Sequence, residues 1–233
     1  ENIFAGNGSD EIIDLLVRIF VNPDESVLVI EPTYGMYKVA AETAGVSVQS
    51  CSLNDKFQID VPSVLNSITP DTKIIFCCSP NNPTGNLLRA EDIEELYKKF
   101  KGIVVVDEAY IEFASKESLS KRVADFENLV ILRTFSKMWG LAGIRVGYAV
   151  ANEQVVRYLD KIKAPYNINR ISSALAVKAL SEKDTVAGFR SIIIAERERM
   201  AKTLQEMKFT VYLSEANFLL MKYPDASNIA KKL

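Results

Sequence analysis

Residues 73–110 read KIIFCCSPNNPTGNLLRAEDIEELYKKFKGIVVVDEAY, and this stretch decides the fold class. Residues 73–78 and 103–107 are short apolar runs rich in β-branched side chains, which is typical of strands covered on both faces. Residues 90–101 lie between them and have the periodicity of a helix with one apolar face. A strand, a helix and a second strand in this order indicate a parallel pair joined by a crossover, the unit of α/β proteins.

The same alternation continues outward from this stretch in both directions. Further strands are expected at residues 27–30, 129–133 and 146–150, and further helices at residues 10–21 and 34–44. We therefore predict an α/β fold built on a doubly wound, largely parallel sheet.

Beyond residue 170 the pattern changes and becomes more helical. Two helices, two short strands and a final helical stretch are expected at residues 171–180, 184–207, 210–213, 218–221 and 229–233. We expect residues 1–183 to form a large domain. Residues 184–233 are expected to supply a connecting helix and an incomplete small α+β domain.

The composition excludes several classes of function. The 233 residues include no histidine, so hydrolysis by a Ser-His-Asp or Cys-His arrangement and His-ligated zinc are excluded. Cys51, Cys77 and Cys78 are too few and too badly spaced for a structural zinc site, so no metal is expected. The adjacent pair lies in an apolar run, which favours buried core thiols.

Charge, hydropathy and cysteine content indicate the binding partners and the cellular location to expect. A net charge of -2 does not favour binding to nucleic acid or to a membrane surface, and no apolar run is long enough to span a bilayer. The first residues lack the basic segment of a signal peptide. An odd number of cysteines favours reduced thiols, and we therefore expect a cytoplasmic location.

Polar side chains follow three of the expected strands. Asn82 lies in the turn Ser-Pro-Asn-Asn-Pro-Thr-Gly after the first, Asp107 and Tyr110 follow the second, and Lys137 follows the third. Taken singly, Asp107 could cap a helix, Asn82 could belong to an ordinary turn and Lys137 could be a surface lysine. Ligands bind beyond the carboxyl ends of strands in open α/β sheets. Together these residues therefore favour a binding site at that edge.

Residues 6–11, Gly-Asn-Gly-Ser-Asp-Glu, open the first helix and suggest a phosphate site. The free N–H groups and the dipole of a helix N-terminus favour an anion. The pattern is neither a dinucleotide-binding fingerprint nor a Walker A loop. The carboxylates of Asp10 and Glu11 would repel a phosphate, so we expect them to point away and the backbone N–H groups to bind it.

In this order the motifs resemble the signatures of fold-type I aminotransferases, which use pyridoxal 5'-phosphate (PLP). The motifs that carry the resemblance are the turn at residues 79–85, Asp-Glu-Ala-Tyr at 107–110, Ser136-Lys137 and Arg145. Residues 6–11 and Pro-Thr-Tyr-Gly-Met-Tyr at 32–37 narrow it to the histidinol-phosphate aminotransferases. The resemblance covers essentially the whole chain.

The resemblance implies roles for individual residues, with Lys137, Asp107 and Tyr110 as the catalytic set. Lys137 would bond to the cofactor aldehyde, and loss of solvent there would lower its pKa and make it nucleophilic. Asp107 would pair with the protonated pyridine nitrogen. Tyr110 and Asn82 would hydrogen-bond the phenolic oxygen, and Tyr34 would stack on the ring. The phosphate would be held by Ser9, Asp10, Thr134, Ser136 and Arg145.

The implied reaction exchanges an amino group between histidinol phosphate and 2-oxoglutarate in histidine biosynthesis, in a homodimer. Three alternatives stay open: an aromatic amino-acid aminotransferase, a decarboxylase of threonine phosphate, and a non-catalytic fragment that keeps the fold. Members of the family extend further at both ends, with a tyrosine in an N-terminal arm and a substrate-binding arginine near the C-terminus. The resemblance therefore implies a chain truncated at both ends.

Overall fold

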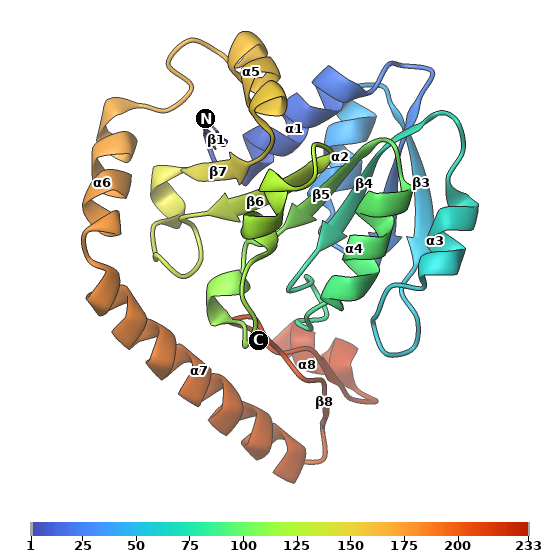
Figure 1. Cartoon of the computed structure of the whole chain (residues 1–233). Helices are drawn as coiled ribbons and strands as arrows, with labels where there is room; N and C mark the ends of the chain where they lie inside the picture. Colours follow the sequence, from blue (N-terminus) through green and yellow to red (C-terminus); the bar gives the residue numbers. More distant parts are fainter. Residues whose placement is uncertain (1, 233) are drawn as a thin grey trace.

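The computed structural model describes residues 2–232, so Glu1 and Leu233 lie outside the described residues. Its core is a seven-stranded sheet in the order β1-β7-β6-β5-β4-β2-β3 (Figure 1). Neighbours from β3 to β6 are parallel, whereas β7 is antiparallel to both β6 and β1. The strands are β1 (Ile3–Gly6), β2 (Ser26–Glu31), β3 (Ser47–Ser52), β4 (Thr72–Cys78), β5 (Ile103–Asp107), β6 (Leu129–Thr134) and β7 (Gly147–Val150). The predicted α/β fold with a largely parallel sheet is confirmed.

Helices cover both faces of this sheet, as a doubly wound fold requires. The helices are α1 (Ser9–Phe20), α2 (Met36–Thr43), α3 (Val61–Ser67), α4 (Ala90–Lys99), α5 (Glu153–Ile162), α6 (Arg170–Leu180), α7 (Lys183–Glu206) and α8 (Ala226–Lys232). One buried cluster joins the sheet to α1, α2 and α5, with Leu16 and Leu159 among its members. A second cluster joins the opposite face to α3 and α4 through Val64 and Leu96. Each face therefore has its own core.

The pleat of the sheet decides which side chains meet at its carboxyl edge. Val105 belongs to the cluster under α1 and α2, and side chains two residues apart on a strand share a face. Asp107 is therefore on the α1 and α2 side. In the parallel register Cys78 of β4 is its partner across the ladder. Thr134, two residues after Leu132 of the same cluster, lies on that side at the end of β6.

The sequence prediction lacks two strands and two α-helices of the described residues, namely β1, β3, α3 and α5, and three short 3-10 helices at Ile111–Phe113, Leu119–Ala124 and Ala142–Ile144. β1 has four residues and β3 reads SVQSCS, and both are edge strands whose side chains are partly exposed. Edge strands do not need the continuous apolar pattern of covered strands. The strand expected at residues 218–221 is wrong in position, since the structure has β9 (Met221–Lys222) paired with β8 (Thr210–Val211).

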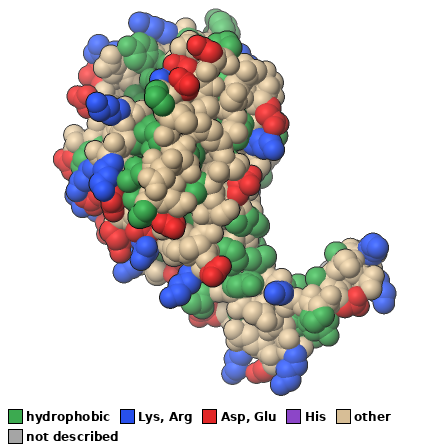
Figure 2. All heavy atoms as spheres, turned by 90° about the vertical axis from the view of Figure 1, so that its right-hand side faces the viewer, with side chains coloured by type: hydrophobic (Ala, Val, Ile, Leu, Met, Phe, Trp, Pro, Cys, Tyr) green, Lys and Arg blue, Asp and Glu red, His purple; other side chains and the backbone are tan. Residues whose placement is uncertain are grey.

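The C-terminal part leaves the main sheet along α7 and returns through β8, β9 and α8 (Figure 1). The last helix confirms the expected helical stretch as far as Lys232. In Figure 2 a smaller part stands out below the main body, and acidic and basic side chains are interspersed over the face shown. Within residues 2–232, no helix is long and apolar enough to cross a membrane.

Candidate active site

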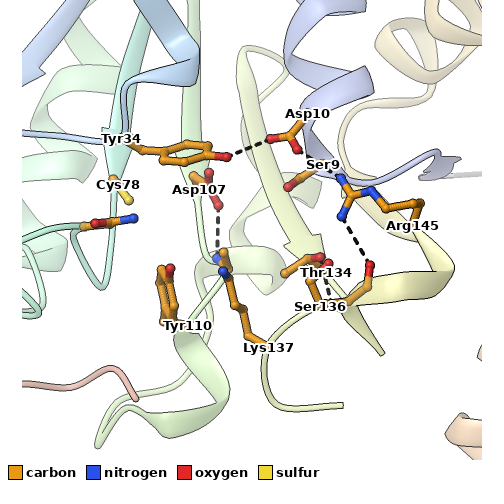
Figure 3. A pocket seen from close by; sticks show the side chains of 13 residues that line it. Ser9, Asp10, Tyr34, Cys78, Asp107, Tyr110, Thr134, Ser136, Lys137 and Arg145 are labelled. Atoms are coloured by element: carbon orange, nitrogen blue, oxygen red, sulfur yellow. Dashed lines mark hydrogen bonds and ion pairs between the residues drawn. The ribbon is translucent and has the colours of Figure 1, made fainter. Parts of the chain in front are cut away.

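A pocket opens at the carboxyl edge of the sheet, and all of the predicted site residues line it (Figure 3). They come from separate segments of the chain that the fold brings together. The lining residues are Ser9, Asp10, Tyr34, Cys78, Asn82, Asp107, Ala109, Tyr110, Thr134, Ser136, Lys137, Ala142 and Arg145. The interpretation of these residues as isolated turn, cap or surface positions therefore does not describe them, although their individual roles stay predictions.

Asp107 lies at the bottom of this pocket as the last residue of β5 and is only 3% exposed. Its Oδ1 accepts the backbone N–H of Ala109 at 3.0 Å, and its Oδ2 accepts the hydroxyl of Tyr37 at 2.9 Å. Burial raises the pKa of the Asp107 carboxyl to about 6, against the opposing effect of these two hydrogen bonds. A buried carboxylate of this kind is stabilised by a cationic partner.

Lys137 and Tyr110 form the next part of the wall. Lys137 Nζ lies 5.2 Å from the centroid of the Tyr110 ring, within reach of a cation–π contact. Burial raises the pKa of the Tyr110 hydroxyl, and the positive charge of Lys137 acts in the opposite direction. Lys137 itself is exposed, so the desolvation expected for this lysine is wrong for the chain as it stands. Tyr110 covers one side of its amine without burying it.

The N-terminus of α1, where the sequence predicts a phosphate site, opens at this pocket. The residue before the helix, Gly8, gives it no capping side chain, so the first backbone N–H groups at Ser9 and Asp10 have no side-chain cap. Arg145 approaches the same point from the segment before β7 with a left-handed backbone, φ 52°. Such strained conformations cluster at functional sites. Thr134 Oγ1 accepts the backbone N–H of Ser136 at 3.0 Å, which fixes the adjoining loop.

The two carboxylates after Gly8 behave differently from each other. Glu11 points away from the pocket as expected, since its Oε2 accepts the Asn7 N–H at 2.6 Å and an N–H of Asn167 at 3.0 Å. Asp10 does not point away. Its Oδ2 pairs with Arg145 at 3.1 Å and its Oδ1 accepts the Tyr34 hydroxyl at 3.1 Å. The expectation for Asp10 is wrong because two donors inside the pocket attract it.

The two asparagines of the turn have different tasks: Asn81 stabilises the turn and Asn82 lines the pocket. Asn81 is 1% exposed, and its amide donates to Pro32 O at 2.9 Å and to Thr84 Oγ1 at 2.7 Å. These bonds stiffen the turn and tie it to the segment before α2. Asn82 is left to line the pocket. The sequence marks both residues, but only the structure separates their tasks.

Sequence reasoning missed two side chains that belong to this site. The sequence predicts Cys78 as a core thiol. It is 3% exposed, which confirms its burial, but it also lines the pocket. Tyr37 lies behind the pocket wall and bonds to Asp107. The feature of the sequence that could have pointed to Tyr37 is its place as the last residue of the motif at 32–37. Its position in the expected helix, however, favours a packing role.

This fold and this arrangement of residues are those of a known family. The model of the class I and II aminotransferases matches residues 1–233, and the chain belongs to this family. Curated histidinol-phosphate aminotransferases of Parabacteroides distasonis and Flavobacterium johnsoniae are 46% and 45% identical to it over 99% and 97% of the chain. The chain spans only 66% and 65% of the length of these relatives.

Solved structures of histidinol-phosphate aminotransferases also match the chain. The histidinol-phosphate aminotransferase of Sinorhizobium meliloti, in complex with pyridoxal-5'-phosphate, matches 99% of the chain with a TM-score of 0.91 and 25% identity. The enzyme of the same name from Clostridium acetobutylicum matches 99% of the chain with a TM-score of 0.88 and 28% identity. The chain covers 64% and 72% of these two structures.

Proposed function

We propose that the chain is the cofactor-binding part of a PLP-dependent aminotransferase that exchanges an amino group between histidinol phosphate and 2-oxoglutarate in histidine biosynthesis. The observation that carries the proposal is one pocket with Asp107 at its bottom, Lys137 on its wall and Arg145 at the N-terminus of α1. In this proposal residues 1–183 are the large domain. Residues 184–233 then supply the connecting helix and part of a small domain.

The residues present fit PLP group by group. Asp107 is a buried carboxylate without a cationic partner in hydrogen-bond contact among the described residues, and a protonated pyridine nitrogen would supply one. The α1 N-terminus and Arg145 suit a phosphate, because backbone N–H groups and a planar guanidinium both bind its oxygens. Asn82 and Tyr110 line the same pocket, and in this proposal they hydrogen-bond the phenolic oxygen. The remaining proposed contacts are ring stacking by Tyr34 and phosphate binding by Thr134, Ser136 and the backbone N–H groups of Ser9 and Asp10. Arg145 would exchange its pair with the Asp10 carboxylate for the phosphate.

When bound, PLP withdraws electrons from the substrate Cα and so makes its proton acidic. Lys137 Nζ would hold the aldehyde end until the amino group of the substrate displaces it. The freed amine would then take the Cα proton and deliver it to the cofactor, which is the work of a general base followed by a general acid. The chain has no histidine, so a lysine amine is a consistent choice for this step. Asp107 keeps the ring nitrogen protonated, and Tyr110 orients the reacting end.

Substrate choice rests on the relatives, since the chain spans only about two thirds of their length. The protein should be assayed with histidinol phosphate, tyrosine, phenylalanine and threonine phosphate, in each case with 2-oxoglutarate. We expect the highest kcat/KM for histidinol phosphate. Preference for an unphosphorylated aromatic amino acid, or release of CO2 from threonine phosphate, would replace the proposal with the corresponding alternative. Lack of turnover with any of them would favour a fragment that only keeps the fold.

The same proposal includes a cytoplasmic homodimer. Apolar side chains of α6 are exposed, including Ile171 at 74% and Val177 at 66%, and a second subunit would bury such a face. The three cysteines are free, which suits a reducing compartment. Sedimentation equilibrium should give twice the mass of the chain, and a monomer at micromolar concentration would contradict this part.

A further inference from the structure

Tyr37 is a fully buried tyrosine whose hydroxyl has a specific partner. Its exposed fraction is 0%, and its hydroxyl donates to Asp107 Oδ2 at 2.9 Å. Tyr37 belongs to α2, whereas Asp107 ends β5, so this bond crosses from helix to sheet. Burying a polar group costs free energy unless the group is hydrogen-bonded, so this bond stabilises both side chains in their buried positions.

The bond completes the fixation of the Asp107 carboxylate. One oxygen is held by the backbone N–H of Ala109, whose position the chain itself determines, and the other by Tyr37. Two donors on two different oxygens fix the plane of the carboxylate as well as its position. A single donor would leave the group free to turn about its Cβ–Cγ bond.

The ring of Tyr37 is itself held in place by two other aromatic side chains. Its ring stacks on Phe76 with centroids 4.7 Å apart and an interplanar angle of 3°. The ring of Tyr34, which lines the pocket, meets it edge to face at 5.6 Å and 83°. These ring contacts therefore hold the hydroxyl in position to donate to Asp107.

The charges around this pair determine that Tyr37 is the donor of the hydrogen bond and Asp107 the acceptor. Burial, and then the charge of Asp107, raise the pKa of the Tyr37 hydroxyl well above its ordinary value, so the hydroxyl remains a donor. The hydrogen bond in turn opposes the effect of burial on the pKa of Asp107. Other groups that act on Asp107 or Tyr37 are Cys78 on β4, Asp10 on α1 and Lys137 after β6.

We propose that Tyr37 is a positioning residue, which keeps Asp107 as an oriented carboxylate for the protonated ring nitrogen of PLP. The role of PLP rests on the proposed function above. The effect on Asp107 itself is a property of this chain without any cofactor. The two can therefore be tested separately.

The test compares the wild type with Tyr37→Phe, which removes a single oxygen and keeps the ring. The carboxyl 13C signal of Asp107, identified by its loss in Asp107→Asn, is followed against pH in protein without PLP. The midpoint should rise by about one pH unit or more in Tyr37→Phe, because the charged carboxylate loses a hydrogen-bond donor. The same variant should bind PLP about tenfold more weakly, measured by fluorescence.

Tyr97→Phe is the matched control. Tyr97 is also buried, at 3% exposed, and it belongs to the cluster on the other face of the sheet. Its hydroxyl has no hydrogen-bond partner among residues 2–232. Its loss should move neither the Asp107 midpoint nor the Kd for PLP. An unchanged Asp107 midpoint in Tyr37→Phe would overturn the role of Tyr37. Failure of the wild type to bind PLP would instead overturn the proposed function.

Discussion

Replacing Asp107 with asparagine removes a buried carboxylate from the proposed site and should change how stability depends on pH. The pKa of Asp107 is raised from 3.8 to about 6 in the folded chain, with burial as the largest cause. Its ionised form is therefore less stable in the folded protein than in the unfolded chain. Without a cofactor, the wild type carries a cost at neutral pH that Asp107→Asn does not.

The sign and size of this effect follow from proton linkage. Below a pH of about 4, Asp107 is protonated in both states and imposes no cost. Between about pH 4 and 6 the unfolded chain ionises while the folded one does not, so the free energy of unfolding falls. Above pH 6 both states are ionised and the loss stays constant. The gap between 3.8 and about 6 corresponds to about 3 kcal/mol.

Urea unfolding of both proteins without PLP, at intervals from pH 4 to pH 8, measures this directly. The difference in free energy of unfolding, Asp107→Asn minus wild type, should grow by about 2–3 kcal/mol between pH 4 and pH 7. Any constant penalty from an unpaired amide hydrogen cancels in this comparison. A difference that does not change with pH, or that shrinks as pH rises, would refute the reasoning.

Two further predictions concern the anion site. Arg145→Gln should raise the Kd for PLP at least about tenfold in equilibrium dialysis, since a charged phosphate contact is lost. It should change the free energy of unfolding by less than about 1 kcal/mol, because the pair with Asp10 is partly exposed. An unchanged Kd would contradict the placement of the phosphate. Gly147→Ala should weaken both PLP binding and stability, because a Cβ there would lie 2.4 Å from the backbone N of Ser9. Gly143→Ala, with no atom within 4 Å, should change neither, and equal effects of the two substitutions would contradict that packing.

The central strands and the site could be predicted because their signals are local. β4, β5 and β6 are covered on both faces, so their continuous apolar runs are visible in the sequence. Once they are parallel, their carboxyl ends must share one edge, which brings Asp107 and Lys137 together. The motif order then identified the same residues that line the pocket.

The rest depends on contacts between segments far apart in the chain. β3 is a polar edge strand that becomes a strand only by pairing with β2. Asp10 turns into the pocket because Arg145, 135 residues later, attracts it. Tyr37 received no role from the sequence, since nothing local shows that its hydroxyl reaches Asp107, 70 residues away.

The covalent attachment of PLP tests the central claim most directly. The protein is incubated with PLP, reduced with borohydride, digested and mapped by mass spectrometry. The account predicts a single pyridoxyl group on Lys137, and no reducible adduct in Lys137→Ala. A pyridoxyl group on another lysine, or an adduct that persists in Lys137→Ala, would contradict it.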